Sequence, residues 1–356
     1  MRTRFEAAVA GMAVAALALT VAACSGGGGS SSTSATGSKP ASSSGVASSL
    51  EQQYEAVVTK ALPAVVQIFT QDATGSGVVY DDKGDIVTNA HVVGSASAVK
   101  VVPATGGAEL TANVLGKFAA GDLAVIRVTS GDGKLAVAKF GDSGKLKVGQ
   151  IVLAMGNPLG LTGSVSQGIV SALGRTVTAA GSAGSAPTTI TDAIQTTAAI
   201  NGGNSGGALV DLAGQVIGIP SAAARDPEAG AAPGIGFAIP SDTATSIANQ
   251  IISTGKVTSS GRAALGVRAS TVITQSGESV GVTIVSLVSG GAAEKAGLQP
   301  GDVITGIASE PIRDTTALNA VLATLKPGQQ VQVQYVRPAQ SNASRTVTVT
   351  LGDLTS

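Results

Sequence analysis

Short runs of apolar, mostly β-branched residues, separated by turns that contain glycine, most strongly constrain how this chain can fold. Such runs occur at Val65–Phe69 and Leu123–Val128 and at residues 99–102 and 151–154. Because the chain has 48 Gly and only 2% aromatic residues, Val, Ile, Leu and Ala have to form its core. Many short strands at this spacing predict a barrel or sandwich of β-strands.

Two helices frame the first set of predicted strands. Residues 50–61 are helical in pattern and precede Pro63, and Ser241–Thr254 has a suitable N-cap in Ser241 and ends at Gly255. A second set of short strands follows, with helical segments at 292–296 and 315–325. We therefore predict domains at residues 50–257 and 262–353, joined by a hinge at 258–261.

Composition excludes several classes of protein. The 22 basic residues balance the 22 acidic ones, which argues against a nucleic-acid binder, and the low aromatic content argues against base-stacking surfaces. The single Cys and single His exclude an intramolecular disulfide, a Cys-based zinc site and any site that needs two histidines. We expect no metal and no cofactor.

The first residues are typical of an export signal. Arg2 and Arg4 precede an apolar run that ends in Val21-Ala22-Ala23-Cys24, which resembles a bacterial lipobox with Cys24 as the lipidated residue. An uncleaved membrane anchor is the alternative. We therefore predict a lipoprotein signal peptide at 1–23 and a Ser/Gly-rich linker at 24–49.

Candidate catalytic residues lie in three separate segments. Ser205 is flanked by glycines in Gly203-Asn204-Ser205-Gly206-Gly207, which suits an exposed nucleophile on a tight turn with nearby oxyanion donors. Asp122 precedes an apolar strand, where it could orient the imidazole of His91, the only histidine. A structural role for each of these residues is the alternative. The order His91, Asp122, Ser205 is that of the chymotrypsin class.

Several segments in the same order resemble the HtrA/Deg family of trypsin-like serine proteases. They include Gly75-Ser76-Gly77-Val78, Thr88-Asn89-Ala90-His91, Asp122-Leu123-Ala124-Val125 and Gly234-Ile235-Gly236-Phe237. The resemblance implies a mostly β chain: a chymotrypsin-like double β-barrel protease domain followed by a PDZ domain. It also implies a triad of His91, Asp122 and Ser205 and an oxyanion hole formed by the backbone N–H groups of Gly203 and Ser205.

The resemblance places substrate binding at Ile219, Pro220 and Ser221. Since no acidic residue lies there, we expect a preference for small or medium apolar side chains. The family often has other residues at Thr197, Gly202 and Pro220, so the sequence leaves specificity and resting-state geometry open.

The C-terminal segment resembles a PDZ domain. The more specific match runs from Gly291-Ala292-Ala293-Glu294 through Gly301-Asp302-Val303-Ile304, and the backbone N–H groups of Leu265, Gly266 and Val267 would hold a peptide carboxylate. The usual Asn-Gly turn is replaced by Ala308-Ser309. A packing domain without a ligand is the alternative.

The sequence thus predicts a membrane-anchored serine endopeptidase on the extracytoplasmic face of the cell membrane. Its expected partners are misfolded or signalling proteins as substrates, C-terminal peptides at the PDZ domain and the membrane through a lipid anchor, and no nucleic acid. The resemblance also implies homotrimers. Two alternatives are a PDZ-based peptide-binding or chaperone module with a latent protease site, and a serine esterase.

Overall fold

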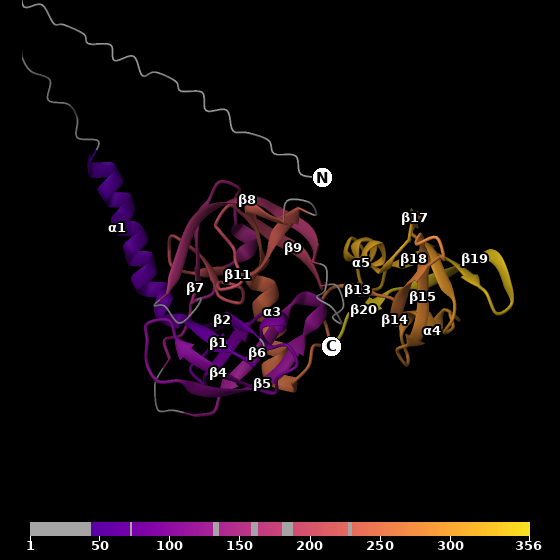
Figure 1. The fold of residues 1–356 in the computed structure, drawn as a ribbon, viewed down its shortest axis with the longest axis horizontal. Helices are drawn as coiled ribbons and strands as arrows, with labels where there is room; N and C mark the ends of the chain where they lie inside the picture. The colour runs from indigo at the N-terminus through magenta and orange to yellow at the C-terminus, as the bar shows by residue number, and fades with distance from the viewer. Residues whose placement is uncertain (1–43, 72, 131–134, 158–162, 180–187, 227–229) are drawn as a thin grey trace, which may run out of the picture. The chain divides into compact units, whose positions relative to one another are not determined.

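The computed structural model describes residues 44–71, 73–130, 135–157, 163–179, 188–226 and 230–356 (Figure 1). The signal peptide, Cys24 and most of the predicted linker lie outside these residues. The first described element is helix α1, Ser44–Ala61. Helix α1 therefore begins six residues before the helix predicted at 50–61. Once residues 50–61 are helical, each residue added at the N-terminal end gains a hydrogen bond without the cost of a second nucleation step.

The first barrel closes in the strand order β1-β2-β3-β6-β5-β4. Its strands are β1 (Val65–Phe69), β2 (Thr74–Val79), β3 (Asp85–Thr88), β4 (Ala98–Pro103), β5 (Leu110–Phe118) and β6 (Leu123–Val128). Side chains alternate along each strand. Val66 and Ile68 fill the barrel interior, whereas Val65 packs in a different core. This alternation matches the predicted β-branched runs.

The second barrel closes in the order β10-β11-β12-β9-β8-β7. Its strands are β7 (Ile151–Gly156), β8 (Ser164–Ala179), β9 (Thr188–Thr196), β10 (Ala208–Asp211), β11 (Val216–Asp226) and β12 (Gly230–Pro240). Strand β8 is the longest of the six, with 16 residues. The chymotrypsin-like double barrel expected from the resemblance is present.

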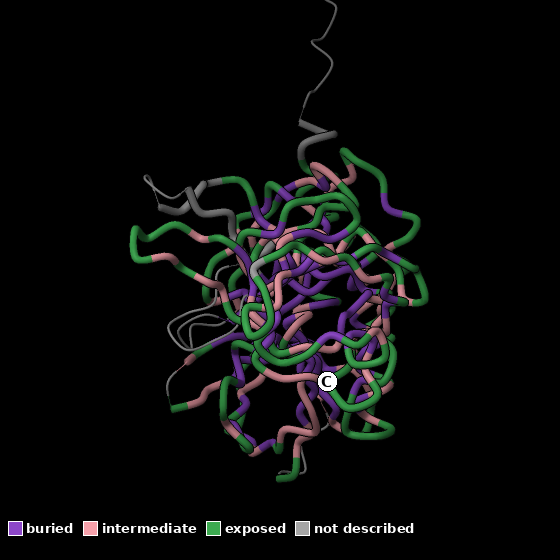
Figure 2. The backbone as a smooth tube through the Cα atoms, turned by 90° about the vertical axis from the view of Figure 1, so that its right-hand side faces the viewer, coloured by how far each residue is buried: buried purple, intermediate pink, exposed green. Residues whose placement is uncertain are grey.

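A shared hydrophobic core joins the two barrels and helix α3, Ser241–Thr254. Val78 and Leu123 of the first barrel belong to the same buried cluster as Met155 of the second and Ile247 of α3. Figure 2 shows the buried segments gathered inside and the exposed segments in turns and loops. This core holds together the barrel edges that carry the candidate catalytic residues.

The C-terminal sheet has its own hydrophobic core. Its order is β14-β15-β16-β18-β19, with strands β14 (Val267–Ile273), β15 (Ser279–Leu287), β16 (Val303–Ile307), β18 (Gln330–Arg337) and β19 (Ser341–Thr350). The short strand β17 (Glu310–Pro311) pairs with β16, and β13 (Ala263–Ala264) pairs with β20 (Gly352–Asp353). Helices α4 (Ala292–Lys295) and α5 (Thr315–Ala323) complete the domain.

The β16–β17 turn takes its shape without glycine. Ala308 and Ser309 both have positive φ angles, 51° and 72°. Two such residues are what a tight hairpin of the Asn-Gly type requires. The substitution noted in the sequence therefore keeps the turn but puts two side chains in a strained conformation.

In the predicted hinge at 258–261, side chains from outside the segment bind the backbone N–H groups. The Gln250 side-chain oxygen accepts hydrogen bonds from Thr258 N and Ser259 N at 3.0 and 2.9 Å. Asp353 Oδ1 accepts one from Ser260 N at 2.7 Å. Turn-forming residues predict a hinge, but the sequence does not show that two distant side chains bind this backbone.

None of the described helices is both long and apolar enough to cross a membrane.

Candidate active site

His91 and Asp122 form a bonded pair on the first barrel. His91 lies on the short helix α2 (Ala90–Val93) after β3, and Asp122 lies just before β6. The two Asp122 carboxylate oxygens lie 2.9 and 2.8 Å from His91 Nδ1, and Asp122 Oδ1 also accepts from His91 N at 3.0 Å. These contacts orient the imidazole through Nδ1, so that Nε2 is the ring nitrogen not bonded to Asp122.

The conformation of Asp122 is enforced locally. Its φ of 55° puts it in the left-handed region, after a short 3₁₀ turn at Ala119–Gly121. Asn89 Nδ2 donates to the Asp122 carbonyl at 2.9 Å, and the Asp122 residue is only 4% exposed. Strain of this kind persists where surrounding bonds over-determine the backbone, as they do here.

Burial and the Asp122 carboxylate shift the pKa of His91 in opposite directions. Desolvation opposes protonation of the ring, but the hydrogen bond and negative charge of Asp122 together outweigh it. The pKa of His91 is therefore raised above its ordinary value. A raised pKa strengthens the imidazole as a base toward a neighbouring hydroxyl.

Ser221 supports the same carboxylate. Its hydroxyl donates to Asp122 Oδ2, and the residue is 9% exposed. The sequence predicts Ser221 as a specificity-pocket residue, whereas the structure engages its hydroxyl with the candidate triad. Ile219 is fully buried in the core between the barrels, which argues against contact with substrate. The Pro220 carbonyl accepts from Gly206 N at 2.8 Å.

The second barrel brings Ser205 to the same place. Ser76 N donates to the Ser205 carbonyl at 2.9 Å. The fit beside Ser205 is so close that a Cβ on Gly206 would lie 2.3 Å from Ser76 O and 2.5 Å from Thr88 Oγ1. Gly206 also has a φ of 81°, so the turn requires glycine both for space and for conformation. The three predicted triad residues are therefore brought to one junction.

Ser76 itself is a functional candidate that sequence reasoning missed. Its hydroxyl donates to Gly203 O at 2.6 Å and accepts from Asn157 N at 2.9 Å. It is fully buried and bonds the turn around Ser205 to the first barrel. The Gly75-Ser76-Gly77 motif was the only signal, and it assigned no role to the serine.

The turn before Ser205 holds its own polar groups. The Ser205 hydroxyl donates to Asn201 O at 3.2 Å and makes no hydrogen bond to His91 within the described residues. Gly203 N, a predicted oxyanion donor, donates to Asn201 Oδ1 at 3.0 Å. The other predicted donor, Ser205 N, has no hydrogen-bond partner among the described residues. Only one of the two predicted oxyanion donors is therefore free.

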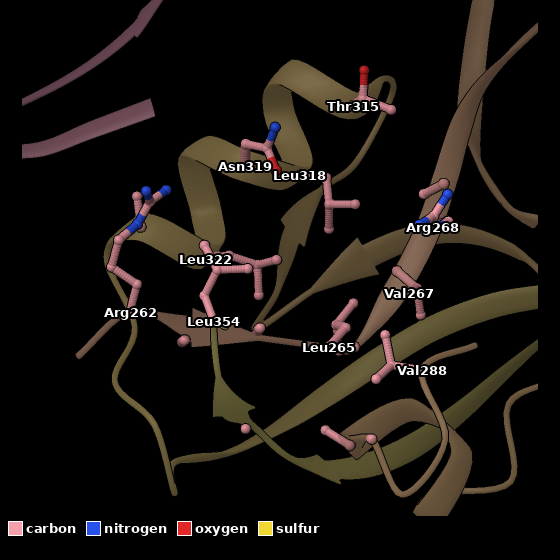
Figure 3. A pocket seen from close by; sticks show the side chains of 18 of the residues that line it. Arg262, Leu265, Val267, Arg268, Val288, Thr315, Leu318, Asn319, Leu322 and Leu354 are labelled. Atoms are coloured by element: carbon pink, nitrogen blue, oxygen red, sulfur yellow. The ribbon is translucent and has the colours of Figure 1, made fainter. Parts of the chain in front are cut away.

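A groove of about 880 Å³ lies in the C-terminal domain, between β14 and α5 (Figure 3). Leu265, Leu318 and Leu322 line its apolar part, and Arg262 lies at one end. Burial lowers the pKa of Arg262 to about 10. Strand β14 is an edge strand of the described sheet and offers a side for pairing.

The predicted carboxylate loop borders this groove. Gly266 has a φ of 71°, and the carbonyls of Leu265 and Gly266 accept from Ala293 N and Val288 N, each at 2.8 Å. Within the described residues, the N–H groups of Leu265 and Gly266 have no hydrogen-bond partner. This arrangement suits a carboxylate acceptor.

Each of the two folded domains matches a known protein family. A trypsin-like peptidase domain matches residues 75–219, and a PDZ domain matches residues 263–351. The serine protease PepD of Mycobacterium tuberculosis (strain ATCC 25618 / H37Rv) is 42% identical over 316 residues, covering 84% of this chain and 66% of PepD. The HtrA-type protease AlgW, solved with a decapeptide, has a TM-score of 0.54 and 31% identity, and the match covers 85% of this chain and 98% of that one.

The chain belongs to the HtrA family of serine proteases. A probable periplasmic serine endoprotease of the DegP-like type from Rhizobium meliloti (strain 1021) is 39% identical over 290 residues. That match covers 80% of this chain and 54% of the relative. The chain thus spans about half to two thirds of the length of these sequence relatives. The family assignment agrees with the resemblance found in the sequence.

Proposed function

We propose that the chain is a serine endopeptidase that cleaves misfolded or signalling proteins with His91, Asp122 and Ser205. The observation that carries the proposal is the bonded His91–Asp122 pair beside the glycine-flanked turn of Ser205. The buried carboxylate, the raised pKa of His91 and the free Ser205 N–H each support one step of acyl transfer.

In the proposed reaction, the Ser205 hydroxyl attacks the scissile carbonyl while His91 Nε2 accepts its proton. His91 then donates that proton to the leaving amine, and water releases the acyl group by the same route. Asp122 holds the tautomer and stabilises the cationic imidazole. The N–H groups of Ser205 and Gly203 would bind the oxyanion, which is typically worth about 3–4 kcal/mol per donor.

The test is the intact mass of the protein after treatment with a fluorophosphonate. We expect one adduct on the wild-type chain and none on Ser205→Ala. Ser164→Ala serves as a control, because it removes another hydroxyl of the second barrel at an exposed position. An adduct that persists in Ser205→Ala would contradict the assignment of the nucleophile.

One observation favours a second candidate, a peptide-binding module with a protease site that is latent at rest. Gly203 N and the Ser205 hydroxyl are both engaged with Asn201. Labelling that appears only when a C-terminal peptide is present would support this candidate. Labelling at the same rate without peptide would exclude it.

We further propose that the groove between β14 and α5 binds C-terminal peptides and that binding raises protease activity. The peptide would pair with the edge of β14, with its carboxylate at Leu265, Gly266 and Val267. Leu318→Lys, which puts a charge into the apolar part of the groove, should abolish binding of peptides measured by fluorescence anisotropy. Unchanged affinity would contradict this placement.

We propose that Cys24 becomes a lipidated N-terminus that anchors the protein on the extracytoplasmic face of the membrane. Two acyl chains suffice for stable anchoring, whereas one holds only marginally. Cys24→Ser should move the protein from the membrane fraction to the soluble extracytoplasmic fraction or leave the leader uncleaved. Unaltered membrane attachment with a mature N-terminus would contradict the proposal.

Assembly into homotrimers rests on the family alone, and sedimentation of the chain would test it.

A further inference from the structure

The side chain of Asn201 accepts a hydrogen bond from Gly203 N, a backbone group that the proposed reaction assigns to the oxyanion. Asn201 Oδ1 accepts from Gly203 N at 3.0 Å and from Asn204 N at 3.3 Å. The Asn201 carbonyl accepts from the Ser205 hydroxyl at 3.2 Å. One residue therefore engages both the candidate nucleophile and one predicted oxyanion donor.

The turn is closed from the other side as well. Asn204 Oδ1 accepts from Asn201 N at 2.9 Å, and Asn204 Nδ2 donates to Ala199 O at 2.8 Å. Asn204 is only 4% exposed, whereas Asn201 is exposed. The buried asparagine thus fixes the frame of the turn, and the exposed one can leave it at little cost.

The chemistry of the occupant matters. Asn201 Oδ1 is an amide oxygen, the same acceptor that a substrate peptide presents in its ground state. An oxyanion is a stronger acceptor, because hydrogen bonds to ionised groups are roughly twice as strong as neutral ones. The Asn201 amide oxygen therefore binds Gly203 N about as strongly as a substrate carbonyl does. The oxyanion of the tetrahedral intermediate binds it more strongly and displaces Asn201.

We propose that Asn201 is a positioning residue that acts as an internal ligand of the Gly203 amide and restrains the resting enzyme. The inference rests on the proposed function and deepens it. Asn201 would have to swing outward in each acylation, so its removal would speed the first chemical step. A residue that only builds the turn would have the opposite effect, because its loss would disorder the donors.

The test compares the rates at which a fluorophosphonate labels the full-length wild type and Asn201→Ala. Of the two hydrogen bonds that Asn201 Oδ1 accepts, only the one from Gly203 N competes with the oxyanion. Its loss should make labelling about two- to twelvefold faster in the variant. The gain should appear in the limiting rate and not in the half-saturating probe concentration, because the oxyanion bond forms in the transition state. An equal or slower limiting rate would overturn the inference.

Two further variants guard against misfolding and general loosening. Asn201→Ser keeps a weaker acceptor at the turn and should label at a rate between those of wild type and Asn201→Ala. Ser166→Ala removes a hydrogen bond of 2.9 Å to Ala199 O, the same carbonyl that Asn204 uses, and should label like the wild type. A rate for Asn201→Ser at or below that of the wild type, with its thermal midpoint unchanged, would also refute the inference.

The same experiment separates the two proposals. If the wild type labels at Ser205 and Asn201→Ala is no faster, the inference fails while the proposed function stands. If neither the wild type nor any variant labels, with or without a peptide for the groove, both fail.

Discussion

Ser76→Ala is the substitution that most directly tests how the two barrels hold the turn that carries Ser205. The hydroxyl of Ser76 donates to Gly203 O and accepts from Asn157 N. Its removal leaves the N–H of Asn157, a residue only 3% exposed, without that partner. Gly203 is only half-buried, so water can replace the bond there.

The expected loss in the free energy of unfolding follows from the different burial of Asn157 and Gly203. An unsatisfied buried donor costs about 1–3 kcal/mol, and the loss of an ordinary hydrogen bond costs about 0.5–1.5 kcal/mol. We therefore expect the free energy of unfolding to fall by about 1.5–4.5 kcal/mol in all. Since Gly203 would also lose its anchor, labelling of Ser205 should slow by at least about tenfold, a smaller loss than a displacement of 1 Å can cause.

Urea denaturation followed by circular dichroism measures the first quantity, and the fluorophosphonate rate measures the second. Ser166→Ala is the matched control, because it removes one exposed serine hydrogen bond and should cost only about 0.5 kcal/mol. A loss below about 1 kcal/mol in Ser76→Ala, together with normal labelling, would refute the reasoning.

Three further predictions follow from the described geometry. Asp122→Asn places an amide donor against His91 Nδ1 and forces the wrong tautomer, so labelling should fall about 10⁴-fold; a loss under tenfold would contradict this role. The neutral ring is the base and its pKa is raised, so the labelling rate should fall, as pH drops, around a midpoint above 6.5. A midpoint at or below that value would be inconsistent with the pair. Ser309→Gly relieves a φ of 72° and should add about 1 kcal/mol to the free energy of unfolding in urea, whereas unchanged stability would show that the turn is unstrained.

Much of the fold could be predicted because it is encoded locally. The apolar run Val65–Phe69 and the helical segment Ser241–Thr254, which ends at Gly255, both match the observed elements. The predicted N-cap is wrong, because Ser241 is the first helical residue and its hydroxyl donates to Gly141 O at 2.7 Å. The second half of strand β8 is harder to predict, because Gly174, Arg175 and Thr176 interrupt its apolar residues. Its pairing with β9, and not its composition, makes that half a strand.

The site divides in the same way. The triad candidates were found because their motifs are local and follow a known order. The bonds of Ser76 to Gly203 and of Ser221 to Asp122 join residues 127 and 99 positions apart. No spacing rule predicts which faces of two barrels meet, so these contacts, and the engagement of Gly203 by Asn201, required the three-dimensional structure.

The division of the proposed triad between two barrels has a consequence for the folding of the chain. His91 and Asp122 belong to the barrel that forms from the first part of the sequence, and Ser205 belongs to the barrel completed only at β12. A chain that folds from its N-terminal end therefore assembles the base and its support well before the nucleophile is in place. Until the second barrel has folded, the proposed triad is incomplete, so the folding chain cannot cleave its own segments at this site.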